Sequence, residues 1–156
     1  MEYTLTQFRN IVGLSLETHR HWKRVLPPLT VRQGRAPCFT VGDIIAGAVV
    51  RHLTDVGGLR VGHLADISDA LLAQCNLTPW ATLTTSLLVI DCDRRDCQLI
   101  TSSQSPTADG LILIFPLQPV LERIRASLLK DIGDERQTSL RFPPLGMPAA
   151  RRKVRA

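Results

Sequence analysis

Two short helical patterns near the beginning of the chain are separated by a single break, Val12-Gly13-Leu14-Ser15. Glycine adopts the positive φ of a tight turn without steric cost, and serine is a favoured residue for capping a new helix. We therefore expect a helix capped by Thr6 and running through Ile11, followed by a helix from Leu16 to Val25 capped by Ser15. Two helices joined by so short a turn must pack across each other, which strongly restricts the fold.

The second helix has an apolar side and a polar side. Its apolar residues are Leu16, Trp22, Val25 and Leu26, which predict an inner face in which Trp22 belongs to the core. Its outer residues are expected to be Thr18, His19, Arg20, His21, Lys23 and Arg24. Such a row of cations is either an ordinary solvated face or a surface for a polyanion.

Further elements follow at short intervals up to Pro79. Pro27–Phe39 is expected to be extended, as a short β-wing with Gly34 at its turn and Phe39 as its packing anchor. Thr40 is expected to cap a third helix, which the nearly continuous apolar run Ile44–Val50 identifies as the most buried one. A fourth helix is expected from about Val61 to Ala73.

These elements and the spacing of particular residues over positions 3–74 resemble the DNA-binding domain of MerR-type (mercury-resistance-type) transcription regulators. The residues that carry the resemblance are Tyr3-Thr4-Leu5, Val12-Gly13-Leu14-Ser15, Thr18-x-Arg20-x-Trp22, Leu26-Pro27-Pro28, Arg35-x-x-x-Phe39-Thr40-x-x-Asp43-Ile44, Leu53-x-x-Val56-Gly57 and Val61-x-x-Leu64. The resemblance implies a winged helix-turn-helix of four helices and a short β-wing. In such domains the second helix enters the major groove and the wing contacts the adjacent backbone.

The resemblance also implies roles for individual residues. Thr18, His19, Arg20 and His21 are expected near base edges or phosphates, and Lys23, Arg24, Arg32 and Arg35 on the backbone. Arginine can bridge O6 and N7 of guanine, so Arg20 is the first candidate for base reading. The complete expected DNA-binding set is Ser15, Thr18, His19, Arg20, His21, Lys23, Arg24, Arg32 and Arg35.

The net charge favours the same kind of partner. The chain has a formal charge of +5, and residues 136–156 carry six Arg and Lys but no Asp or Glu. A basic protein attracts polyanions, so the charge favours an anionic partner. The resemblance implies that this partner is double-stranded DNA, with RNA polymerase as a further candidate partner. The longest apolar run, Leu111–Phe115, is far shorter than a membrane span, and the sequence opens without a signal-peptide pattern. Together with four scattered cysteines, these features predict a cytoplasmic, nucleoid-associated protein without a membrane partner.

The hydrophobic period changes after Pro79, which predicts a second, smaller module. Strands are expected at Ser86–Cys92, Gln98–Ile100 and Leu111–Phe115, the last of them central because it is apolar on both faces, followed by a helix from Pro119 to about Leu129. The fold class is therefore α+β. The expected divisions are a DNA-binding domain at 1–76, a β-β-β-α module at 80–132, and a basic, disordered tail at 133–156. Where MerR-type regulators continue into a long dimerisation helix, this chain has the small module instead.

This module is interpreted as the surface of a homodimer, since one sheet and one helix bury only one face. A self-contained subdomain and a small-ligand pocket remain alternatives. The sequence therefore predicts a regulator that binds an inverted repeat as a dimer. Two other classes stay open: a DNA-architectural or recombination-accessory protein of the excisionase or partition-adaptor kind, and an interaction protein whose basic ends are incidental.

Catalytic and metal chemistry are not expected. The sequence has no arrangement typical of an activated nucleophile and no glycine-rich phosphate loop. Cys92 and Cys97 are flanked by aspartates, but four residues separate them, unlike the close pairs of structural zinc sites. We interpret them as facing strand cysteines, and His52 and His63 as packing or helix-end residues. No cofactor, metal or enzymatic activity is predicted.

Overall fold

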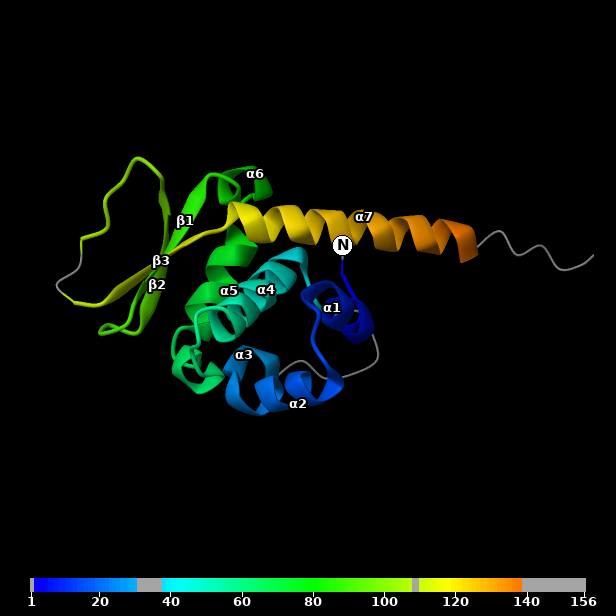
Figure 1. Cartoon of the computed structure of the whole chain (residues 1–156), viewed down its shortest axis with the longest axis horizontal. Coiled ribbons are helices and arrows are strands. Elements are labelled where there is room, and N and C mark those ends of the chain that lie inside the picture. Colours follow the sequence, from blue (N-terminus) through cyan, green and yellow to red (C-terminus); the bar gives the residue numbers. More distant parts are fainter. Residues whose placement is uncertain (1, 31–37, 108–109, 139–156) are drawn as a thin grey trace, which may run out of the picture.

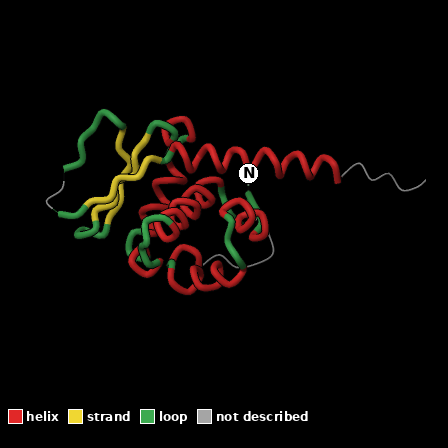
Figure 2. Tube along the Cα trace, in the orientation of Figure 1, coloured by secondary structure: helices red, strands yellow, loops and turns green. Residues whose placement is uncertain are grey.

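The computed structural model describes residues 2–30, 38–107 and 110–138. In order along the chain, its elements are α1 (Leu5–Val12), α2 (Leu16–Val25), α3 (Pro27–Thr30), α4 (Val41–Asp55), a 3-10 helix η1 (Val61–Leu64), α5 (Ser68–Leu77), α6 (Trp80–Leu83), β1 (Ser86–Asp91), β2 (Asp96–Thr101), β3 (Ile112–Pro116) and α7 (Gln118–Thr138). The sheet lies at one end of a group of helices, and α7 runs from the sheet along those helices (Figures 1 and 2). The α+β class predicted from the sequence is confirmed.

The turn between the first two helices follows the predicted local chemistry. Gly13 ends α1 with φ 76°, and its N–H donates to the Arg9 carbonyl at 2.7 Å. Ser15 caps α2 by accepting a hydrogen bond from the Thr18 N–H at 3.0 Å. The first helix begins earlier than predicted, because Thr4 rather than Thr6 is its cap and forms a reciprocal capping box with Gln7.

The segment after α2 departs from the predicted extended structure. Pro27–Thr30 is the short helix α3. Proline is well tolerated in a first helical turn, because the N–H groups there have no carbonyl acceptor within the helix. Residues 31–37 of the predicted wing, which include Arg32, Gly34 and Arg35, lie outside the described residues. Phe39, the last residue of the predicted wing, pairs with Tyr3 in an isolated antiparallel bridge and is buried, as expected of a packing anchor.

Helix α4 is the central helix, as the apolar run predicted. It contacts α1, α5 and α7, and every residue from Gly42 to Val50 is buried. Thr40 caps it, with Asp43 completing a capping box. The single helix expected from Val61 to Ala73 is instead divided into η1 and α5.

The sheet is antiparallel and has the order β2-β1-β3, so the prediction of a central third strand is wrong. Strand β1 occupies the centre, and its consecutive residues Leu88, Val89 and Ile90 are all buried. Leu88 lies opposite both Leu99 and Phe115. The apolar residues of β3 face both sides, but Ile114 is 49% exposed, which is compatible with an edge strand.

Helix α7 is longer than expected and joins the two predicted modules. It continues to Thr138, so the first residues of the predicted disordered tail are helical, while residues 139–156 lie outside the described ranges. It contacts both α1 and α4, and β2 contacts α5. One cluster of buried side chains consequently extends from Tyr3 to Ile124 and crosses Pro79 without a break.

Candidate nucleic-acid interface

Helix α2 divides its side chains between the core and solvent. His19, Trp22 and Leu26 are buried, and their spacing of three and four residues places them on one side of the helix. Trp22 is thus a core residue, as predicted. The residues of the expected site that are exposed on this helix or at its cap are Ser15, Thr18, Arg20, His21 and Arg24, with Lys23 half-buried.

His19 is the one described member of the expected site that lies in the core rather than on the outer face. Its imidazole packs edge-on against Phe8 and Phe39, with ring centroids 6.2 and 6.5 Å away. Burial, reinforced by the positive charges of Arg9 and Lys23, lowers the pKa of His19. The prediction that His19 shares the outer surface is therefore corrected, since a neutral, buried ring is not available to a ligand.

The beginning of α2 is held by its own hydroxyl groups. The Ser15 and Thr18 side-chain oxygens lie 2.8 Å apart, in addition to the bond from the Thr18 N–H to Ser15. Glu17 lies in the first turn, and Lys23 and Arg24 lie in the last turn, where each charge is favoured by the helix dipole. The basic residues Arg20 and Arg24 are four positions apart, so their side chains leave the same region of the helix surface.

A residue that sequence reasoning missed fixes the turn between α1 and α2. Arg51 of α4 donates from Nη1 to the Val12 carbonyl at 3.0 Å and from Nε to Asp55 at 2.9 Å. The guanidinium thereby satisfies a carbonyl at the end of α1 and joins the turn to the central helix. Arg51 lies 39 residues beyond Val12, so no local sequence signal could reveal this contact.

Helix α2 lies at the edge of the helical group (Figure 1). In Figure 1, α2 and α3 lie on the opposite side of the helical group from α7. Arg32 and Arg35, expected beside α2, are outside the described residues, so the structure places only the α2 part of the predicted interface.

Cys92, Cys97 and His52, which were also singled out from the sequence, lie in different surroundings. Cys97 is buried opposite Ile90, while Cys92 lies exposed in the turn after β1, so the two are not facing strand cysteines. His52 packs on Phe115 with ring centroids 4.9 Å apart, as a packing histidine. Within residues 2–30, 38–107 and 110–138, no cluster of three or more His, Cys, Asp or Glu side chains is arranged to hold a metal ion. No helix in these ranges has the length and apolar character needed to cross a bilayer.

Comparison of the chain with protein-family models, curated proteins and solved structures finds no significant match.

Proposed function

We propose that this protein is a sequence-specific transcription regulator that binds double-stranded DNA through the exposed face of α2. The observation that carries the proposal is the division of this one helix. His19 and Trp22 anchor it in the core, while Arg20, His21 and Arg24 project into solvent. A helix anchored on one side and basic on the other has the form required to enter a major groove.

The individual side chains have complementary chemistry. Arg20 carries a planar guanidinium that can bridge O6 and N7 of guanine, which supplies sequence discrimination. Arg24 and Lys23, one turn further along, suit the phosphates on the groove edge, which fix the register of the protein on DNA. The hydrogen bond from Arg51 to the Val12 carbonyl supports this arrangement, because it connects the turn before α2 to the central helix α4.

The proposal includes a homodimer on an inverted repeat. Among the described strands, β3 pairs with β1 alone and is an edge strand. Ile114 on this strand and Leu111 just before it are 49% and 64% exposed. An edge with exposed apolar residues is suited to a second copy, and two-fold symmetry would present two α2 helices to successive DNA grooves. RNA polymerase is the further candidate partner of such a regulator in the nucleoid.

The test is a selection of bound genomic DNA fragments with the purified full chain, repeated at several salt concentrations. A shared inverted repeat is the expected result. Arg20→Ala should weaken binding to the selected site by about tenfold or more, as expected for loss of a bidentate base contact. Arg94→Ala is the matched control, because Arg94 is an exposed arginine in the turn between β1 and β2.

Other outcomes of this experiment would distinguish between the alternative functions of the protein. Strong binding without sequence preference, and with a steep salt dependence, would favour the DNA-architectural or recombination-accessory function. Absence of binding at low salt, in a protein that remains folded, would reject both DNA-binding functions. The double variant Arg20→Ala with Arg35→Ala extends the test to the predicted wing.

A further inference from the structure

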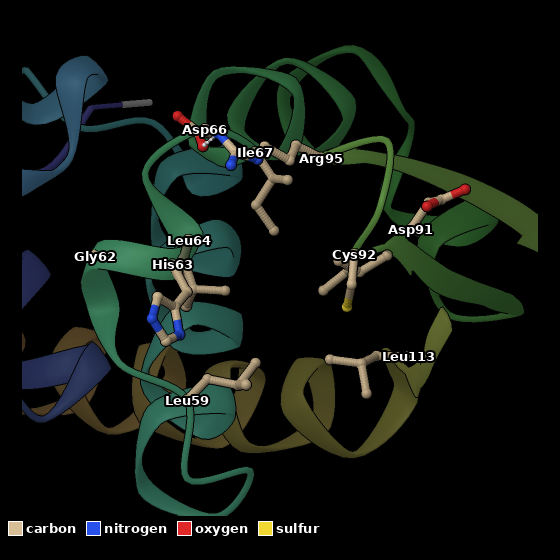
Figure 3. Close-up of a pocket in the computed structure, with 11 residues that line it drawn as sticks. Leu59, Gly62, His63, Leu64, Asp66, Ile67, Asp91, Cys92, Arg95 and Leu113 are labelled. Atoms are coloured by element: carbon tan, nitrogen blue, oxygen red, sulfur yellow. Dashed lines mark hydrogen bonds and ion pairs between the residues drawn. The ribbon is translucent and has the colours of Figure 1, made fainter. Parts of the chain in front are cut away.

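A cavity lies between the helical part and the sheet. It has a volume of about 460 Å³ and opens between the η1 segment and the turn that joins β1 to β2. Figure 3 shows that its two sides come from segments far apart in sequence, residues 59–67 and residues 90–95 together with Leu113. A cavity of this size is within the range of small-molecule sites.

Aliphatic side chains on both walls of this cavity lie beside polar residues. Leu59, Leu64 and Ile67 contribute the helical side, and Ile90 and Leu113 contribute the sheet side. Leu59 and Leu113 are only half-buried, although both belong to the margin of the core. An apolar ligand that covered the exposed parts of these two leucines would remove them from water, which is favourable.

A solvent-exposed ion pair lies at the mouth of the cavity. Arg95 Nη1 lies 2.9 Å from Asp66 Oδ2, which connects the β1–β2 turn to the segment before α5 (Figure 3). Arg95 also has a φ of 54°, the only positive φ among the described residues that are not glycine. A left-handed backbone conformation is common in the short turn of a β-hairpin, so this φ belongs to the connection between β1 and β2.

The charged groups around the cavity are already engaged. Arg95 is paired with Asp66, and the Asp91 carboxylate accepts hydrogen bonds from the N–H groups of Asp93 and Arg94. In Figure 3 that carboxylate points away from the cavity, whereas the Cys92 sulfur points into it. A charged ligand would therefore find no unpaired Asp or Arg side chain among the described lining residues to compensate its lost hydration, which is unfavourable. An uncharged ligand avoids this cost.

We propose that this cavity is a binding site for an uncharged, predominantly apolar small molecule. The aliphatic walls surround its body, and the Cys92 thiol and the His63 imidazole at the rim provide hydrogen-bonding groups for a polar end. Because η1 and α5 belong to the helical part that carries α2, the ligand would contact both this part and the sheet. The proposal does not depend on DNA binding, because binding of the ligand is measured in the absence of DNA.

The experiment titrates the full chain with N-phenylnaphthylamine, a neutral apolar fluorophore, and in parallel with anilinonaphthalene sulfonate. The two probes share one aromatic skeleton and differ by a negatively charged sulfonate. The neutral probe should give a saturable fluorescence increase with one site per chain, and the sulfonate should bind at least about tenfold more weakly because of its uncompensated charge. Equal or tighter binding of the sulfonate would overturn the preference for an uncharged ligand.

Variants of the turn then locate the probe. Cys92→Trp places an indole at the cavity mouth from an exposed position and should weaken binding by about tenfold or more. Cys92→Ser preserves the space and should bind as the unaltered protein does. Arg94→Trp introduces the same indole in the same turn, at a position that does not line the cavity, and should also bind normally.

A second readout does not require any variant to fold. Saturating neutral probe should slow the alkylation of Cys92 by N-ethylmaleimide at least about threefold, with the half-buried Cys38 as the internal reference. Peptide mapping by mass spectrometry measures both rates in one sample. The absence of saturable binding, or binding that neither protects Cys92 nor weakens in a folded Cys92→Trp variant, would overturn the site.

Discussion

Replacement of Asp43 by alanine should be among the most destabilising single changes of a polar residue in this chain. Asp43 is only 2% exposed and lies in the first turn of the central helix. Its carboxylate accepts a hydrogen bond from the Thr40 N–H at 2.7 Å and another from the Asn76 side-chain amide at 3.0 Å. It therefore closes the capping box of α4 and connects the beginning of α4 to the end of α5.

The expected magnitude follows from these two bonds. A hydrogen bond to a buried charged group contributes about 1.5–3 kcal/mol. Asn76 is exposed, so water can replace its lost partner. The contribution of its hydrogen bond is therefore taken at the lower end of this range. Allowing for this, Asp43→Ala should lower the free energy of unfolding by about 3 kcal/mol, which corresponds to a fall in Tm of about 6–12 °C for a protein of this size. Asp43→Asn keeps one carbonyl oxygen and should lose about half as much.

Urea unfolding followed by circular dichroism measures these differences. Asp69→Ala is the matched control, because Asp69 is also an acidic residue in the first turn of a helix but is exposed. It should cost less than about 1 kcal/mol, the value of a favourable charge at a helix beginning. The Asp43→Ala and Asn76→Ala double-mutant cycle should give a coupling of about 1 kcal/mol. If Asp43→Ala costs no more than Asp69→Ala, the reasoning from burial and capping is wrong.

Three further predictions concern other buried groups. Gly47→Ala should destabilise by about 1–3 kcal/mol in urea unfolding, because the new methyl would lie 2.9 Å from Cζ of the Phe8 ring; a neutral or stabilising effect would contradict this packing. Burial is the larger cause and the neighbouring cations the smaller cause of the lowered pKa of His19. The unfolded chain therefore binds a proton at this imidazole more readily than the folded chain does. Stability should therefore fall as the pH decreases below about 6.5, and His19→Gln should remove that part of the pH dependence in unfolding measured from pH 5 to 7.5. Burial also raises the pKa of the Cys97 thiol to about 12. At pH 8 iodoacetamide should consequently modify the exposed Cys92 at least about a hundredfold faster than Cys97, as measured by mass spectrometry, and comparable rates would contradict the burial of Cys97.

The features that the sequence predicted correctly are those determined within a few residues. Gly13, Ser15 and Thr40 mark helix ends through contacts made inside one turn, and each does so in the structure. The burial of Trp22 also follows from local helical spacing. His19 shows the limit of residue type as a guide, because it lies three residues before Trp22 on the same face, yet its polarity suggested the outer surface.

Features that depend on distant segments were not accessible in the same way. The order of the strands is decided by how β3 returns beside β1, and the apolar composition of β3 alone does not distinguish a central strand from an edge. The contact between Arg51 and Val12 and the cavity between η1 and the sheet likewise join residues that no short pattern relates. The extended structure predicted from Pro27 onward was wrong for a different reason, since proline is compatible with both an extended segment and a first helical turn.

The buried cluster that crosses Pro79 has a consequence for how this chain can be altered or exchanged. In a protein whose two domains have separate hydrophobic cores, one domain can be replaced while the other still folds. Here α7 covers parts of α1 and α4, and β2 covers part of α5. A chain ending near Pro79 would leave those apolar surfaces in water, so the C-terminal half covers the core of the N-terminal helices. Any graft onto residues 1–78 would have to supply an equivalent cover.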